Sequence, residues 1–139
     1  MTDAPTHRVT LTRLSEGVYE ARNGRGTTLT VNGAGHFSAI ELLLAALGGC
    51  TSVDVDLMTT RRAEPEAFEV VVSGTKATEG GNRMTDLQVS FRLRFPGGED
   101  GDKARERVPR AVKTSHERHC TVSRTIEAGT PIAFTIEDA

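Results

Sequence analysis

Apolar and polar residues alternate along most of this chain, which is the pattern of short β-strands with one covered face. The alternation is clearest in residues 86–95, where every second residue is apolar, and this segment is expected to form a long antiparallel hairpin with residues 68–75. An Asn-Gly pair at residues 23–24 predicts a second tight turn near the N-terminus. The predicted strands cover residues 7–14, 18–22, 27–31, 68–75, 86–95, 121–126 and 132–136.

One long helix is predicted within residues 37–62, where the alternation gives way to an apolar run. Ser38 and Glu41 have the Ser-x-x-Glu spacing of a capping box, which marks a helix start. Residues 40–47 are apolar apart from Glu41, so we expect this half of the helix to be buried on every side. The apolar run is too short, and followed too soon by charge, to predict a membrane span.

A second helix is predicted from Asp102, a plausible N-cap, to about Arg118. Pro109 lies inside it, so either the helix kinks or it begins near Val108. The predicted order is βββ-α-ββ-α-ββ. This order indicates an α+β fold of mostly antiparallel sheet around a long buried central helix, with the second helix as a cover.

Composition restricts the class of protein. A length of 139 residues suits a single domain, 1–139. The net charge is −2 and Trp is absent, which argues against nucleic acid or a membrane surface as partner. The N-terminus lacks the apolar segment of a secretory signal, so we expect a cytoplasmic protein.

The most unusual residues of the long predicted helix are Gly48, Gly49 and Cys50, near its middle. Two glycines inside a helix cost about 1 kcal/mol each relative to alanine, so another group is expected to approach the backbone there. If the glycines break the helix, Cys50 lies at a new N-terminus, which lowers the pKa of a thiol. Cys50 is then either a small packed side chain or a redox-active thiol with Cys120 as its partner.

Two segments, each centred on a cysteine, resemble the OsmC/Ohr family of osmotically induced and organic-hydroperoxide-resistance proteins. They are Leu-Leu-Leu-Ala-Ala-Leu-Gly-Gly-Cys-Thr-Ser-Val-Asp-Val at 42–55 and His-Glu-Arg-His-Cys-Thr-Val-Ser at 116–123. The first is similar to the OsmC-like branch. The resemblance implies an OsmC-like fold, an intertwined homodimer with its long helices buried at the centre, and a role in oxidative stress.

The same resemblance implies a cysteine-based peroxidase that reduces organic hydroperoxides. Cys50 would attack the peroxide and Cys120 would resolve the sulfenic acid as a disulfide. A dithiol donor, either a lipoyl protein or a small thiol, would reduce that disulfide, and no cofactor is implied. The alternative is a non-catalytic protein that binds a small apolar ligand beside the Gly-Gly pair, with structural cysteines.

Glu41 departs from the family pattern. In the characterised peroxidases a glutamate ten residues before the cysteine helps to hold the thiolate, but that position here is Ile40. Glu41 stands nine residues before Cys50, and in a continuous helix nine steps of about 100° place it on the opposite side. Capping is therefore one role of Glu41 and catalysis the other.

A cation beside the thiol is also required by the resemblance, because an early strand of the family carries an arginine. Arg22 and Arg25 flank the Asn-Gly turn, and Arg22 is the better candidate; each is otherwise a solvated charge at a hairpin. Asp54, one helical turn after Cys50, would raise the pKa of the thiol if it lies near.

The run His116-Glu117-Arg118-His119-Cys120 is rich in metal ligands. Neighbouring residues point in different directions on a helix, and a second paired cluster is absent from the sequence. Histidines at a helix C-terminus, where they complement the dipole, are the competing interpretation. We therefore expect no metal here.

Overall fold

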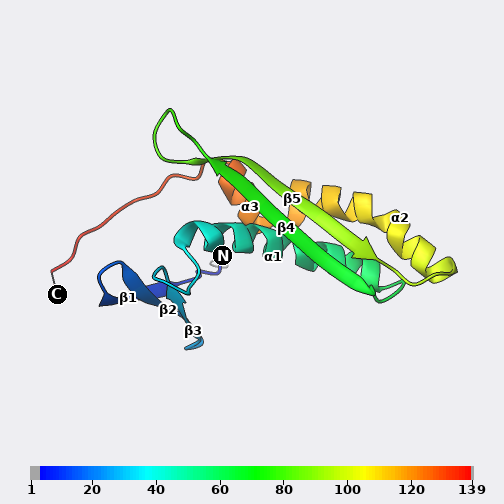
Figure 1. Cartoon of the computed structure of the whole chain (residues 1–139), viewed down its shortest axis with the longest axis horizontal. Coiled ribbons are helices and arrows are strands. Elements are labelled where there is room, and N and C mark those ends of the chain that lie inside the picture. The colour runs from blue at the N-terminus through cyan, green and yellow to red at the C-terminus, as the bar shows by residue number, and fades with distance from the viewer. Residues whose placement is uncertain (1–3, 139) are drawn as a thin grey trace. The chain divides into compact units, whose positions relative to one another are not determined.

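The computed structural model describes residues 4–138. The chain forms two compact units, divided between Leu43 and Leu44, inside its first helix. Figure 1 labels the elements in chain order. The structure is α+β, with a three-stranded antiparallel sheet in the first unit and a two-stranded antiparallel sheet in the second.

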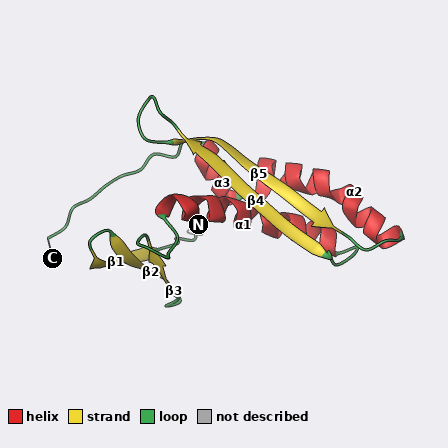
Figure 2. Ribbon diagram, in the orientation of Figure 1, coloured by secondary structure: helices red, strands yellow, loops and turns green. Residues whose placement is uncertain are grey.

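The first unit contains the strands β1 (Val9–Ser15), β2 (Val18–Asn23) and β3 (Thr28–Val31), in the order β1-β2-β3 (Figure 2). The Asn-Gly turn between β2 and β3 is organised by Asn23, whose side-chain oxygen accepts the N–H groups of Arg25 and Thr27, each at 3.0 Å. The three predicted N-terminal strands are confirmed.

Helix α1 (Ala39–Thr60) begins with the predicted capping box. The Ser38 N–H donates to Glu41 Oε1 at 2.9 Å, and the Glu41 N–H donates to Ser38 Oγ at 3.1 Å. Two N–H groups that lack partners at a helix start are thus satisfied by each other's side chains. The prediction of a helix start at this point is confirmed.

Burial along α1 is one-sided in the single chain. Its inner face consists of Leu47, Gly48, Thr51, Val55 and Thr59, which are buried. The prediction that residues 40–47 are buried on every side is wrong for the single chain, because Ile40 and Leu43 are exposed. Further along, Val53 and Leu57 are also exposed, by 56% and 63%, so an apolar face of α1 is left uncovered by residues 4–138.

By length and composition α1 could cross a membrane, contrary to the expectation from its apolar run alone; it is the one such helix in residues 4–138. A core helix meets the same criterion. In the second unit the buried face of α1 packs against other elements of the chain, and its Thr51 side chain is hydrogen-bonded to another helix.

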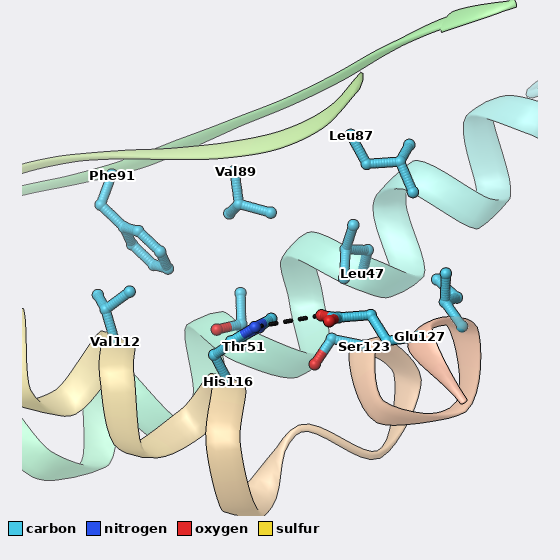
Figure 3. A pocket seen from close by; sticks show the side chains of 10 residues that line it. Leu47, Thr51, Leu87, Val89, Phe91, Val112, His116, Ser123 and Glu127 are labelled. Atoms are coloured by element: carbon cyan, nitrogen blue, oxygen red, sulfur yellow. Dashed lines mark ion pairs between the residues drawn. The ribbon is translucent and has the colours of Figure 1, made fainter. Parts of the chain in front are cut away.

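The second unit contains the long hairpin of β4 (Ala67–Lys76) and β5 (Met84–Arg94). Along β5 the odd-numbered residues 87–93 are partly buried and the even-numbered residues 88–94 are exposed, as the alternation predicts. Leu87, Val89 and Phe91 point from β5 toward α1 (Figure 3). The predicted hairpin is confirmed.

Helix α2 (Glu99–Thr114) starts earlier than predicted. Gly98 is its N-cap, and Asp102 lies inside the first turn, where its carboxylate pairs with Arg105 at 2.9 Å. The helix runs through Pro109, so a start near Val108 is wrong. Ala104 and Ala111, on its inner side, are fully buried.

After α2 the chain departs from the predicted strands. A π-helix, η1 (Ser115–His119), leads to Cys120 and then to helix α3 (Thr121–Glu127) where a strand was predicted. The β-branched residues of this segment favour a strand, but Cys120 caps a helix and Val122 and Ile126 stand four apart on its partly buried side.

The last predicted strand, residues 132–136, is also wrong for the single chain. Residues 130–138 have no regular secondary structure and extend away from α3 (Figure 1). Ile132, Phe134 and Ile136 alternate along this segment and are 78%, 87% and 99% exposed. An alternating segment forms a strand only when another strand pairs with it.

Candidate functional site

The two cysteines, far apart in sequence, come together in the second unit. Cys50 lies in the middle of α1 and is partly buried, and Cys120 lies between η1 and α3 and is fully buried. The Cys120 thiol lies near enough to the Cys50 thiol to raise its pKa. The two cysteines are not joined by a disulfide. The structure therefore brings together the two cysteines that the sequence singled out.

The surroundings of Cys50 favour its neutral thiol. Burial raises the pKa of the Cys50 thiol above its ordinary value of 9.0, because a thiolate loses hydration there. The backbone N–H of Val122 lowers this pKa, the adjacent Cys120 thiol raises it, and the N–H of Thr121 lowers it; burial is the largest effect. A thiolate at Cys50 therefore needs a further source of positive charge.

The pair Gly48-Gly49 does not break α1, so the condition for a helix N-terminus at Cys50 is not met, and the pKa of the thiol is raised rather than lowered. The close approach that the glycines predict is confirmed at Gly48. A Cβ on this residue would lie 2.5 Å from Val72 Cγ2 of β4. Gly49 is different, because a Cβ there would meet nothing within 4 Å.

Asp54 has a partner other than Cys50. Its Oδ2 accepts a hydrogen bond from Ser115 Oγ at 2.5 Å, and Ser115 Oγ also lies 3.0 Å from Thr51 Oγ1. Asp54 is not among the groups that shift the pKa of Cys50. Sequence reasoning missed Thr51 and Ser115; the indication it overlooked is that Thr51 and Asp54, three residues apart, place polar groups on one face of an apolar helix.

A cavity of about 390 Å³ lies beside this network, within the second unit (Figure 3). It is walled by apolar side chains and closed at one side by polar ones, including the ion pair of His116 with Glu127 at 3.2 Å. Its lining is Leu47, Thr51, Leu87, Val89, Phe91, Val112, His116, Ser123, Ile126 and Glu127. Sequence reasoning did not predict this cavity, because its walls come from five separate elements.

The other two candidate residues, Arg22 and Glu41, lie in the first unit. Arg22 donates to the Gly26 carbonyl at 3.3 Å and pairs with Glu20 at 3.2 Å, with about half of its side chain exposed. Glu41 is occupied by the capping box, and the hydrogen bonds from Ser38 lower the pKa of its carboxyl. Capping of α1 by Glu41 is observed, and a role for either residue beside Cys50 stays a prediction.

The potential metal ligands of residues 116–120 have separate surroundings in the structure. His116 pairs with Glu127, whereas Cys120 is buried at the cap of α3. Within residues 4–138 no group of three or more His, Cys, Asp or Glu side chains is arranged to hold a metal ion.

Comparison with known proteins identifies the class to which this fold belongs. The OsmC-like protein model matches residues 32–135, and the chain belongs to this family. An uncharacterized protein of Mycobacterium tuberculosis H37Rv, Rv2923c, is 28% identical over 123 residues, which are 86% of this chain and 88% of that protein.

Solved structures share the fold. A hypothetical protein from Aquifex aeolicus VF5 has a TM-score of 0.73 at 22% identity, covering 91% of each chain. The organic hydroperoxide resistance protein OhrB of Bacillus subtilis has a TM-score of 0.54 at 18% identity, covering 86% of this chain and 89% of that one. At these identities the likeness concerns the fold alone.

Proposed function

We propose that this protein is a thiol peroxidase that reduces organic hydroperoxides, with Cys50 as the attacking thiol and Cys120 as the resolving thiol. The observation that carries the proposal is the proximity of the two thiols, one on α1 and one at the start of α3. Membership of the OsmC-like family and the shared fold with a hydroperoxide-resistance protein add support.

The proposed cycle has three steps. Two take place within the protein, and in the third a donor reduces the protein. The Cys50 thiolate attacks the peroxide, the O–O bond breaks, and an alcohol leaves after taking a proton, with Cys50 as a sulfenic acid. Cys120 attacks that sulfur and releases water, which leaves a disulfide. A dithiol donor, a lipoyl protein or a small thiol, then supplies two electrons and two protons to restore both thiols.

The raised pKa of Cys50 sets a requirement for this function. A positive charge must reach Cys50 to make its thiolate accessible near neutral pH. Arg22 is the proposed cation, and its present partners, Glu20 and the Gly26 carbonyl, are exposed surface contacts that are weak enough to exchange.

The proposed working form is a cytoplasmic homodimer in which the whole chain forms one OsmC-like domain. The second unit presents an exposed apolar face on α1, formed by Ala46, Gly49, Val53 and Leu57. The C-terminal segment presents a further alternating apolar pattern, and within residues 4–138 no strand pairs with it. A second copy of the chain is the proposed cover for both.

The test is consumption of cumene hydroperoxide with dihydrolipoamide as the reductant. Wild type should turn over, and Cys50→Ser should lose activity completely. With the reductant omitted, Cys120→Ser should consume about one equivalent of hydroperoxide and then stall as a sulfenic acid. A sulfenic-acid trap such as dimedone identifies the stalled species by mass. Equal peroxide consumption by wild type and Cys50→Ser would rule out this function.

A second candidate function is favoured by the cavity beside Thr51. Its volume of about 390 Å³ and its mostly apolar walls fit a small apolar ligand with one hydrogen-bonding group. The ligand site differs from the one expected beside the Gly-Gly pair, because Val72 fills the space at Gly48. Saturable binding of 1-octanol that raises the Tm, in a protein with an unreactive Cys50, would favour this function over the peroxidase.

A further inference from the structure

Ser115 is a fully buried hydroxyl that joins two helices. Its Oγ donates to Asp54 Oδ2 at 2.5 Å, and because a hydroxyl has one proton, Thr51 Oγ1 must donate to Ser115 across 3.0 Å. The hydrogen bonds therefore run from Thr51 to Ser115 to Asp54. They tie the start of η1 to α1 at two positions three residues apart.

Ser115 also holds Cys120 through the backbone. The Cys120 N–H donates to the Ser115 carbonyl at 2.7 Å, a bond over five residues that closes the π-helix. On its other side Cys120 is fixed by Ser123, whose N–H donates to Cys120 Sγ at 3.4 Å and whose hydroxyl donates to the Cys120 carbonyl at 3.2 Å. A π-helix is rare and occurs often at functional sites. In this chain the hydrogen bond that closes η1 fixes the position of the Cys120 backbone.

The two α1 residues in this network are neighbours of Cys50. Thr51 follows it directly, and Asp54 lies one helical turn later. The same turn of α1 therefore carries Cys50 and anchors the segment that ends in Cys120. None of the three anchoring side chains, Thr51, Asp54 and Ser115, takes part in the proposed redox chemistry itself.

We infer that Thr51, Ser115 and Asp54 are positioning residues that hold Cys120 against Cys50 and so set how readily the two thiols form a disulfide. Effective concentrations of well-oriented groups are high, and they fall steeply when the groups are displaced by about 1 Å. The inference rests on the proposed function for its biological role. The disulfide equilibrium itself is measurable without any peroxide.

The test measures the equilibrium of the two protein thiols with glutathione disulfide. The Cys50 and Cys120 thiols give two electrons and two protons to glutathione disulfide, which yields the protein disulfide and two glutathione thiols. The full-length protein is equilibrated at a series of glutathione ratios, and the disulfide fraction is determined by mass after alkylation. Cys120→Ser identifies mixed disulfides with glutathione.

The variants remove or keep single hydroxyls of the network. In Ser115→Ala and in Thr51→Val we expect the equilibrium constant for disulfide formation to fall about tenfold or more, because the hold on Cys120 is loosened. Ser115→Thr and Thr51→Ser keep the hydroxyl and should restore most of the wild-type constant. Circular dichroism at the assay temperature checks that each variant is folded.

Thr59→Val is the matched control for Thr51→Val. Thr59 is also buried on the inner face of α1, but its hydroxyl donates to Val55 of its own helix at 2.8 Å and does not reach η1. We expect this control to change the Tm without changing the disulfide equilibrium. Wild-type constants in both Ser115→Ala and Thr51→Val, or an equal fall in Thr59→Val, would overturn the inference.

The two proposals fail in different ways. A wild type that forms the disulfide in glutathione but consumes no hydroperoxide removes the peroxidase function and leaves the positioning role intact. A wild type that consumes hydroperoxide, with variants that keep its disulfide equilibrium, removes the positioning role and leaves the peroxidase function intact.

Discussion

Gly48 of α1 and Val72 of β4 approach so closely that a Cβ on Gly48 would stand 2.5 Å from Val72 Cγ2. Real Cβ atoms do not come this near to another carbon, so a glycine is required where the helix crosses the sheet. A Cβ on the neighbouring Gly49 would meet no atom within 4 Å. Two adjacent glycines in one helix thus have different reasons to be there.

Alanine substitutions should separate the two glycines. We expect Gly48→Ala to lower the free energy of unfolding by about 1–3 kcal/mol, because the new methyl group displaces Val72 in a packed interface. The adjacent Gly49→Ala is the control and should gain about 0.5–1 kcal/mol in the monomer from helix propensity. Urea denaturation of the dilute, reduced protein measures both, and partial recovery in Gly48→Ala/Val72→Ala would locate the clash. Equal effects at the two positions would contradict this account.

The capping box makes a prediction about Ser38. Removing its hydroxyl in Ser38→Ala leaves the Glu41 N–H without its partner, which should cost about 1 kcal/mol of unfolding free energy. Ser38→Thr keeps the acceptor and is the matched control. Thermal denaturation followed by circular dichroism provides the measurement, and an unchanged Tm in Ser38→Ala would remove the stabilising role of the cap.

Glu41 connects the same cap to pH. Its carboxyl has a pKa below the ordinary 4.5, because Ser38 donates to the charged form. The folded state therefore binds its proton less readily than the unfolded state. The stabilisation is present above pH 4.5 and is lost as the pH falls through the folded pKa. Glu41→Gln should flatten the dependence of unfolding free energy on pH below 4.5. If Glu41 is only a cap, Glu41→Gln keeps its peroxidase activity; complete loss of activity in a folded variant would indicate catalysis.

The proposed role of Arg22 is tested through the pH dependence of Cys50 alkylation. Burial raises the pKa of Cys50 above 9.0, so we expect Arg22→Ala to need alkaline pH for iodoacetamide alkylation of Cys50, whereas wild type should react at lower pH. Arg25→Ala, a loss of charge at the same hairpin, should keep the wild-type profile. The alkylation rates are followed by mass spectrometry in a Cys120→Ser background.

The pH dependence of the stability of Arg22→Ala gives a second check on the pKa of Cys50. With the folded pKa of Cys50 raised above 9.0, the stabilisation from its neutral thiol is complete below that pH and disappears as the pH rises through the folded value. Identical alkylation profiles for wild type and Arg22→Ala would exclude Arg22 as the cation.

Local patterns in the sequence were sufficient for the five strands β1 to β5 and for the start of α1. Alternation in β5, the Asn-Gly turn and the Ser38–Glu41 pair are each decided by residues near in sequence, and each is found as predicted. Segment 121–126 failed because its β-branched composition was outweighed by the cap at Cys120 and by packing of one helical side.

The candidate site shows the same division between local and distant information. Its two cysteines were found because each lies in a distinctive short segment. The Thr51–Ser115–Asp54 network was missed because it joins residues more than sixty positions apart through hydroxyls that look ordinary in sequence. The raised pKa of Cys50 was missed because it depends on burial, which the unbroken helix determines.

The exposed apolar face of α1 leads to a prediction about self-association. Leu57 is 63% exposed and Val53 is 56% exposed, four residues apart on one side of the helix. In the proposed homodimer this face is covered by a second copy. We therefore expect Leu57→Lys to shift the protein from dimer to monomer at micromolar concentration, because a buried lysine without a partner is strongly disfavoured.

Analytical ultracentrifugation measures this shift, with Gln88→Lys as the control. Gln88 lies on the exposed side of β5, so its substitution adds the same charge to the second unit away from the apolar face. The control should remain dimeric. Loss of peroxidase activity together with the dimer in Leu57→Lys would further indicate that Cys50 depends on a group from the second copy. A wild type that sediments as a monomer, or a Leu57→Lys variant that stays dimeric, would show that this face of α1 is not the interface.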